Sequence, residues 1–142
     1  MRINDVIRRK GGDVVTVKPD DTVARLLELL AEHRIGALVV SVDGASIEGI
    51  VSERDVVRQL HHRGPEILSI TVSQIMTTTV ETCDLDADTQ DLARKMTDRR
   101  IRHIPVVHEG RLHGIVSIGD VVKQRLDELQ TERDSLVGYL QS

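Results

Sequence analysis

An internal repeat constrains the fold of this chain more than any other feature of its sequence. The stretch GIVSERDVV at residues 49–57 returns as GIVSIGDVV at residues 114–122. The flanking sequence repeats as well, and one residue is lost between the two glycines of the matched turns, where a duplicated unit tolerates a change in length. The matched positions are Ile35 with Ile101, Gly44 with Gly110, Ser52 with Ser117 and Asp55 with Asp120.

Each copy carries the same order of secondary-structure signals. A short extended run (14–22 or 79–88) precedes an amphipathic helix, two β-rich runs joined by a glycine turn, and a second helix. Three short strands with two helices are too small to be stable alone, so each copy is expected to cover the other. We predict an α/β (α+β) fold of tandem β-α-β-β-α repeats with pseudo-twofold symmetry and clefts between the copies. The expected ranges are 1–63 for the first repeat, 64–75 for a connector and entry helix, 76–124 for the second repeat, and 125–142 for a C-terminal helical extension.

Composition excludes several classes of function. The net charge is −4 with scattered basic residues, and Tyr139 is the only aromatic residue, so nucleic-acid binding is not expected. No apolar run is long enough to span a membrane and no signal peptide is visible, so the expected location is cytoplasmic. Cys83 is the only cysteine, which excludes a disulfide within the chain; we interpret it as a small apolar strand residue rather than a reactive thiol. No histidine spacing typical of a metal site and no catalytic motif occurs, so we expect no metal and no enzymatic activity.

The repeated serine and aspartate admit two interpretations. Ser-x-x-Asp is a capping-box pattern, with the serine at the N-cap and the acid one turn inside the helix. A helix N-terminus at the edge of a cleft also offers free N–H groups to a phosphate, and the aspartate can accept hydrogen bonds from a ribose diol. The two roles are compatible.

The ordered motifs resemble the CBS domain pair, or Bateman module. TVARLLELL precedes RIGALVV and GIVSERDVV in the first half, and MTDRRIRHIPVV precedes GIVSIGDVV in the second, so that the likeness covers about residues 1–124. It is strongest to stand-alone CBS-pair proteins, which have no catalytic domain. The resemblance implies a regulatory module that binds AMP, ADP, ATP, or sometimes NAD or S-adenosylmethionine, between the repeats. It also implies dimerisation.

Site residues can be carried over from the family pattern. Ser52, Asp55, Ser117 and Asp120 are expected to hold ribose and phosphate. Gly119, near the start of a predicted helix, suggests the close approach of a ligand or a neighbouring chain, because glycine is unfavourable there. Arg54, at the same place in the first copy, is either a phosphate ligand or an exposed helix residue.

The second β-rich run adds Arg102, His103 and Pro105. The family pattern places the basic pair near phosphates, and the proline must sit where the sheet needs no N–H donor. The first copy has Gly-Ala-Leu-Val there, with Ala37 but no basic pair, so we expect a better site in the second copy. Thr16 and Lys18 either contact base and sugar or form an ordinary strand edge.

The C-terminal run carries a heptad-like seam. It is interrupted by Arg133, and its members are Val122, Leu126, Leu129, Arg133, Leu136 and Leu140. We expect this helix to pack against a second subunit in a homodimer or across the other repeat, although a simple amphipathic helix on its own domain fits too. The leading hypothesis is a sensor that alters dimer or partner contacts when a nucleotide binds. The alternative is a ligand-independent scaffold, with a redox protein as one candidate among unknown protein targets.

Overall fold

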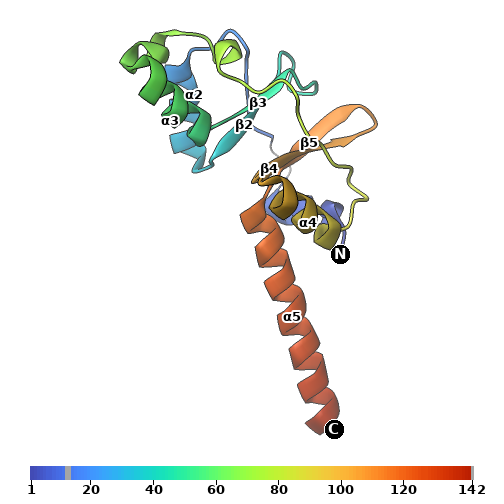
Figure 1. Ribbon diagram of the computed structural model, residues 1–142. Coiled ribbons are helices and arrows are strands. Elements are labelled where there is room, and N and C mark those ends of the chain that lie inside the picture. The colour runs from blue at the N-terminus through green and yellow to red at the C-terminus, as the bar shows by residue number, and fades with distance from the viewer. Residues whose placement is uncertain (12–13, 142) are drawn as a thin grey trace.

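A computed structural model describes residues 1–11 and 14–141, and it has the two-unit architecture that the repeat predicts (Figure 1). Residues 12–13 of the first predicted repeat and residue 142 of the predicted extension lie outside the described part. The first unit contains β1 (Thr16–Val17), α2 (Val23–His33), β2 (Ala37–Val40), β3 (Gly49–Ser52) and α3 (Glu53–Arg63). The second contains α4 (Thr89–Arg99), β4 (His103–His108), β5 (Arg111–Ser117) and α5 (Ile118–Gln141). A helix α1 (Ile3–Lys10) precedes them, and two short 3₁₀ helices, η1 (Pro65–Ser69) and η2 (Val72–Gln74), connect them.

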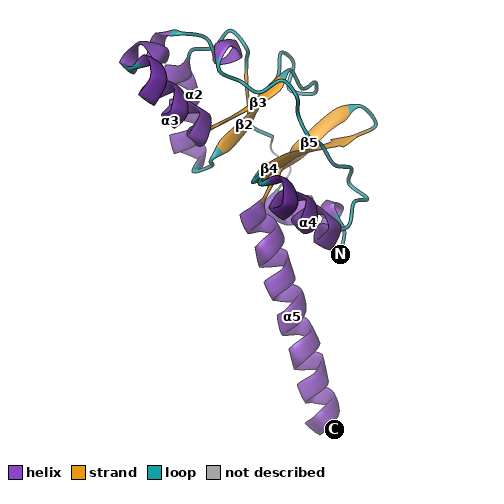
Figure 2. Cartoon of the chain, in the orientation of Figure 1, coloured by secondary structure: helices purple, strands orange, loops and turns teal. Residues whose placement is uncertain are grey.

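The two sheets differ at their first strand. In the first unit β1 pairs parallel with β2. Strand β2 in turn pairs antiparallel with β3 (Figure 2). In the second unit β4 pairs with β5, and the run 79–88 is joined to β4 by an isolated parallel bridge between Cys83 and Val106. The Cys83 N–H donates to Pro105 O and the Val107 N–H donates to Cys83 O. Pro105 has no N–H for a further bond in this ladder, which accounts for the missing strand.

Each helix that follows an extended run begins at a side-chain cap. The Thr22 hydroxyl accepts from the Arg25 N–H at 3.1 Å, and the Asp88 carboxylate accepts from the N–H groups of Gln90 and Asp91. Helix α2 then buries a stripe at helical spacing that includes Val23 and Leu26. Local sequence signals are therefore sufficient to place these helices.

The segment before each unit packs against the other unit. Ile3 and Val6 of α1 are buried in the core of the second unit, whereas Val72 and Ile75 are buried in the core of the first. The backbone repeats this exchange: the Ile3 N–H donates to Ala87 O at 2.9 Å, and the Val72 N–H donates to Asp21 O at 2.8 Å. The repeat boundaries drawn from sequence stay a prediction, but packing crosses them symmetrically.

Helix α5 extends far beyond the rest of the molecule (Figure 1). Val121 and Gln124 near its start are buried, but the predicted seam is exposed, with Leu126 61% and Leu140 74% accessible. Among the described residues, no helix is both long and apolar enough to cross a membrane.

Candidate functional site: a cleft between the two units

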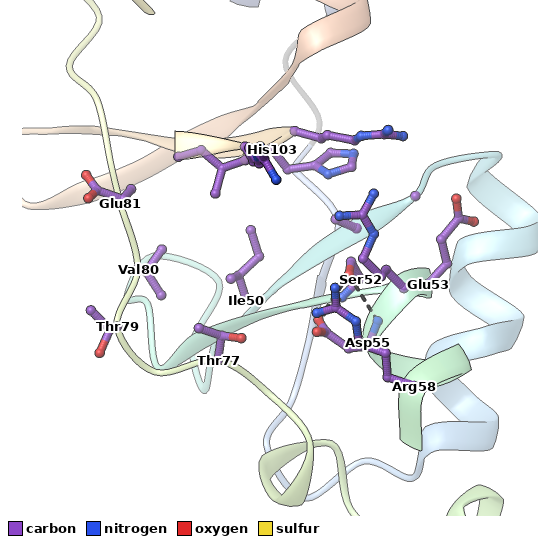
Figure 3. Close-up of a pocket in the computed structure, with 16 residues that line it drawn as sticks. Ile50, Ser52, Glu53, Asp55, Arg58, Thr77, Thr79, Val80, Glu81 and His103 are labelled. Atoms are coloured by element: carbon purple, nitrogen blue, oxygen red, sulfur yellow. Dashed lines mark hydrogen bonds between the residues drawn. The ribbon is translucent and has the colours of Figure 1, made fainter. Parts of the chain in front are cut away.

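A cleft of about 310 Å³ lies where the two units face each other (Figure 3). Such a volume is at the lower end of the range for small-molecule sites. The first unit contributes β2, β3 and the start of α3, and the second contributes the connecting run 77–81 and the segment before β4. The lining residues are Gly36, Ala37, Ile50, Ser52, Glu53, Arg54, Asp55, Arg58, Thr77, Thr79, Val80, Glu81, Arg100, Ile101, Arg102 and His103.

Ser52 and Asp55 form the predicted capping box at one wall of this cleft. The Asp55 N–H donates to Ser52 Oγ at 3.3 Å, and Asp55 Oδ2 accepts from the Ser52 N–H at 2.8 Å and from the Ser52 hydroxyl at 3.0 Å. The capping prediction is confirmed here. The hydrogen bonds that the Asp55 carboxylate accepts from the described residues all involve Oδ2, so Oδ1 is left to face other groups.

Four arginines line the cleft: Arg54, Arg58, Arg100 and Arg102. In the described part of the chain, none of their guanidinium groups forms an ion pair. A neighbouring hollow of about 470 Å³ shares three of these residues, Arg54 among them. The lining acid Glu81 is already paired with Lys95 and Arg99. Two further lining acids, Glu53 and Asp55, form no ion pair with the described residues. Four guanidinium groups therefore face two carboxylates, and this excess of positive charge is suited to an anion.

Sequence reasoning missed Arg58, Arg100 and the run 77–81. Arg58 could have been found, because it lies one helical turn after Arg54 and so on the same face of α3. No local sequence pattern predicts that Thr77, Thr79 and Val80 face the first unit. That proximity arises only when the units pack.

His103 stands at the start of β4, half-buried and close to the first unit. A Cβ on Gly36 would lie 3.5 Å from His103 Nε2. Burial and the nearby Lys10 ammonium lower the pKa of His103, while Glu53 and Asp120 act in the opposite direction. The imidazole is therefore biased toward its neutral form, in which one ring nitrogen donates and the other accepts.

The second Ser-Asp pair has a different environment. The Asp120 N–H donates to Ser117 Oγ at 3.1 Å and the Ser117 N–H donates to Asp120 Oδ2 at 2.9 Å, which confirms the predicted cap. The same Oδ2 accepts from Lys10 Nζ at 2.7 Å. Burial alone would raise the pKa of Asp120, but the Lys10 and Ser117 hydrogen bonds outweigh it and hold the pKa below its usual value.

The structure separates the residues that the family pattern grouped. Ala37, Ser52, Arg54, Asp55, Arg102 and His103 come together in the cleft, whereas Thr16, Lys18, Pro105, Ser117, Gly119 and Asp120 are outside its lining. Arg102 and His103 thus share the cleft with the first Ser-Asp pair, not the second. A side chain at Gly119 would meet only Ser117 Oγ, at 3.6 Å, so nothing in the described chain requires glycine there. Ligand contact by any of these residues stays a prediction.

Comparisons with known proteins agree on the family. The CBS domain model matches residues 3–62 and 72–127. A mitochondrial CBS domain-containing protein of Arabidopsis thaliana, CBSX3, is 37% identical over 98% of this chain and 71% of its own length. The crystal structure of the CBS-domain protein ATU1752 from Agrobacterium tumefaciens is 43% identical and superposes with a TM-score of 0.84, over 88% of this chain and 99% of that one. The crystal structure of the CBS domain NE2398 is 35% identical and superposes with a TM-score of 0.82, over 89% of this chain and 98% of that one. This chain belongs to the CBS domain family, as a tandem pair of repeats.

Proposed function

We propose that the cleft binds an adenine nucleotide, of the AMP, ADP, ATP or NAD type, and that the chain acts as a regulatory module rather than as an enzyme. One observation carries the proposal: four arginines that form no ion pair with the described residues line the same cleft as the first residues of α3 and Asp55, whose Oδ1 accepts no hydrogen bond from those residues. Guanidinium groups and helix N-termini are both favourable partners of phosphate.

Each part of a nucleotide has a counterpart in the lining. Asp55 Oδ1 suits a ribose hydroxyl pair, and the guanidinium groups of Arg54 and Arg102 suit phosphates. Of the first three N–H groups of α3, that of Arg54 is available as well, whereas those of Glu53 and Asp55 donate to Gly36 O and Ser52 Oγ. The base would lie among aliphatic side chains, for which Ile50 and Val80 are available, because the chain has no aromatic residue to stack on it there. The number of phosphates that the arginines can meet would set the preference among AMP, ADP and ATP.

The family supports an adenosine-containing ligand in general terms. The CBS domain pair of protein MJ0100 was solved in complex with methylthioadenosine and S-adenosyl-L-methionine. That pair is 21% identical to this chain, a likeness that speaks for the fold alone, so the choice of a nucleotide rests on the charges of the cleft. We keep the cytoplasmic location as a proposal, and note that the name of the Arabidopsis relative places that protein in mitochondria.

We further propose that a second copy covers the exposed seam of α5. Six exposed apolar residues follow the seam or flank it: Leu126, Leu129, Leu136, Val137, Tyr139 and Leu140. In a parallel pair of these helices Arg133 would face its own copy across the seam, with like charges in contact. An antiparallel pair avoids this repulsion in any register whose two-fold axis lies away from Arg133. Ligand binding near the start of α3 could then alter the geometry of the dimer or of a partner surface.

Calorimetry tests the nucleotide proposal. AMP, ADP, ATP, NAD(H) and S-adenosylmethionine are titrated into the purified protein and into Arg102→Met, with Arg111→Met as a matched control at an exposed position outside the cleft. We expect at least one nucleotide to bind, and Arg102→Met to weaken it by about tenfold, since charge-assisted hydrogen bonds contribute roughly 1.5–3 kcal/mol. If no compound binds at millimolar concentration, the proposal fails. The scaffold alternative gains if, in addition, Asp55→Ala lowers the melting temperature and nucleotides do not shift it.

A further inference from the structure

The two repeated aspartates differ in one contact. Asp55 is bonded only to its own capping serine among the described residues, whereas Asp120 also holds the Lys10 ammonium at 2.7 Å. The same ammonium donates to the carbonyl oxygen of Ile115, also at 2.7 Å. A lysine from the opposite end of the chain therefore bridges a carboxylate and a backbone carbonyl at the second copy of the motif.

In the first copy of the motif, a backbone N–H rather than a lysine donates to the carbonyl oxygen that corresponds to Ile115 O. Ile50 aligns with Ile115, and its carbonyl accepts from the Thr77 N–H at 2.9 Å. Thr77 belongs to the run that lines the cleft, and Asp55 forms no ion pair with the described residues. At the second copy, helix α1 continues to Lys10, and a charged side chain makes the contact that a backbone N–H makes at the first.

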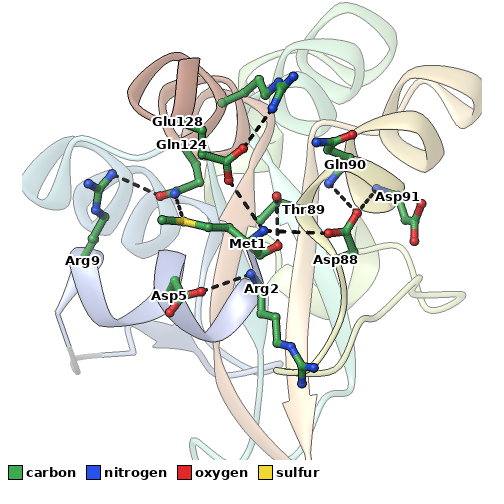
Figure 4. A network of polar contacts seen from close by, with 11 residues as sticks. Met1, Arg2, Asp5, Arg9, Asp88, Thr89, Gln90, Asp91, Gln124 and Glu128 are labelled. Carbon is green, nitrogen blue, oxygen red and sulfur yellow. Dashed lines mark hydrogen bonds and ion pairs between the residues drawn. The ribbon is translucent and has the colours of Figure 1, made fainter. Parts of the chain in front are cut away.

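Packing holds Lys10 in this place. Arg9, its neighbour, donates to Gln124 at 3.1 Å (Figure 4). Arg9 also pairs with Asp127 at 2.5 Å, and the two contacts tie the end of α1 to α5. On the other side α1 approaches β5 closely, since a Cβ on Gly114 would lie 2.9 Å from Ile7 Cδ1. These contacts of α1 with α5 and β5 fix the backbone of Lys10, and so they hold its ammonium near Asp120.

A carboxylate that recognises a ribose diol accepts hydrogen bonds from its hydroxyls, and its negative charge strengthens them. Oδ1 accepts no hydrogen bond from the described residues in either aspartate, so the two copies differ in charge: the Lys10 ammonium on Oδ2 neutralises Asp120 and makes it a weaker acceptor. We propose that Lys10 determines which copy of the motif can bind: the chain takes one nucleotide, at Ser52 and Asp55, and the position at Ser117 and Asp120 is reserved by Lys10. This inference rests on the proposed function. Because the Lys10 and Asp120 side chains are 35% and 24% exposed, removal of the ammonium leaves an accessible carboxylate.

Stoichiometry tests the role of Lys10. The nucleotide that binds best to the unmodified protein is titrated by calorimetry into Lys10→Met, with Lys10→Arg retaining a cation and Arg8→Met removing a matched exposed cation from the same helix. We expect one site per chain in the unmodified protein, in Lys10→Arg and in Arg8→Met, and two in Lys10→Met, with affinity at the second position raised on the order of tenfold. Asp55→Asn should abolish binding, and the double variant Lys10→Met, Asp55→Asn should recover one site.

The outcomes separate the two proposals. Two sites in the unmodified protein, or one site in Lys10→Met, would overturn the role of Lys10 while the proposed function stands. A single site that survives Asp55→Asn but is lost in Asp120→Asn would overturn the assignment of the copies. If no variant binds any nucleotide, the proposed function itself fails, and the role of Lys10 fails with it. Circular dichroism of every variant confirms that each one is folded.

Discussion

The Lys10–Asp120 contact makes a quantitative prediction about stability that needs no ligand. Lys10→Met keeps the aliphatic stem and removes the charge, and Asp120→Asn keeps an oxygen for the Ser117 N–H while it removes the carboxylate. The two single variants and the double variant together form a double-mutant cycle, which isolates the energy of the pair.

The structure bounds the magnitude of that energy. At 2.7 Å two unit charges attract by about 1.5 kcal/mol in bulk water and about 6 kcal/mol at an effective dielectric constant of 20. Both groups are partly solvated, and ordering a lysine side chain costs roughly 1–2 kcal/mol, so most of the larger figure is lost. We expect a coupling free energy of about 1 kcal/mol, above the values typical of fully exposed pairs.

Urea denaturation at low and at high salt measures this coupling. The Arg9–Asp127 pair joins the same two helices but is more exposed, at 52% and 45%, and serves as the matched control with Arg9→Met and Asp127→Asn. Its coupling should be smaller, about 0.5 kcal/mol. Both couplings should decrease at 1 M salt, where the Debye length is about 3 Å. A Lys10–Asp120 coupling within about 0.3 kcal/mol of zero would refute the view that this contact persists in solution.

Four other expectations concern single features. Ser52→Ala should lower the free energy of unfolding by about 1 kcal/mol in urea denaturation, through loss of the α3 cap. The pKa of Asp120 is lower in the folded protein than its usual value of 3.8, so this group stabilises the fold at pH values above 3.8. That stabilisation is lost as the pH falls through the folded pKa, so Asp120→Asn should flatten the acid limb of a stability–pH profile below about pH 4. Burial raises the pKa of Cys83 to about 11, so a thiol reagent at pH 8 should label it much more slowly in the folded than in the unfolded protein. Arg133→Leu should strengthen self-association in sedimentation equilibrium; a monomeric Arg133→Leu would contradict the proposed dimer.

Much of the fold could be predicted from local sequence. The repeat implied two equivalent units, hydrophobic spacing located the helices, and Ser-x-x-Asp announced two capping boxes that the structure contains. These signals act within a few residues along the chain, and so they survive in any tertiary context. The expected first strand of the second repeat did not form as a strand, because Pro105 withholds a donor from the neighbouring ladder.

Only the tertiary structure decided which copy of the motif meets which partners. Sequence placed Arg102 and His103 beside the second Ser-Asp pair, and His103 does pair with Ser117 in the sheet, yet packing also brings both residues into the cleft with the first pair. Likewise Lys10 reaches Asp120 from more than a hundred residues away, through a helix whose apolar face is buried in the opposite unit. Periodicity and capping are properties of residues close together along the chain, and they determined the individual helices and their caps. The composition of the cleft is a property of surfaces brought together by packing, which no local pattern encodes.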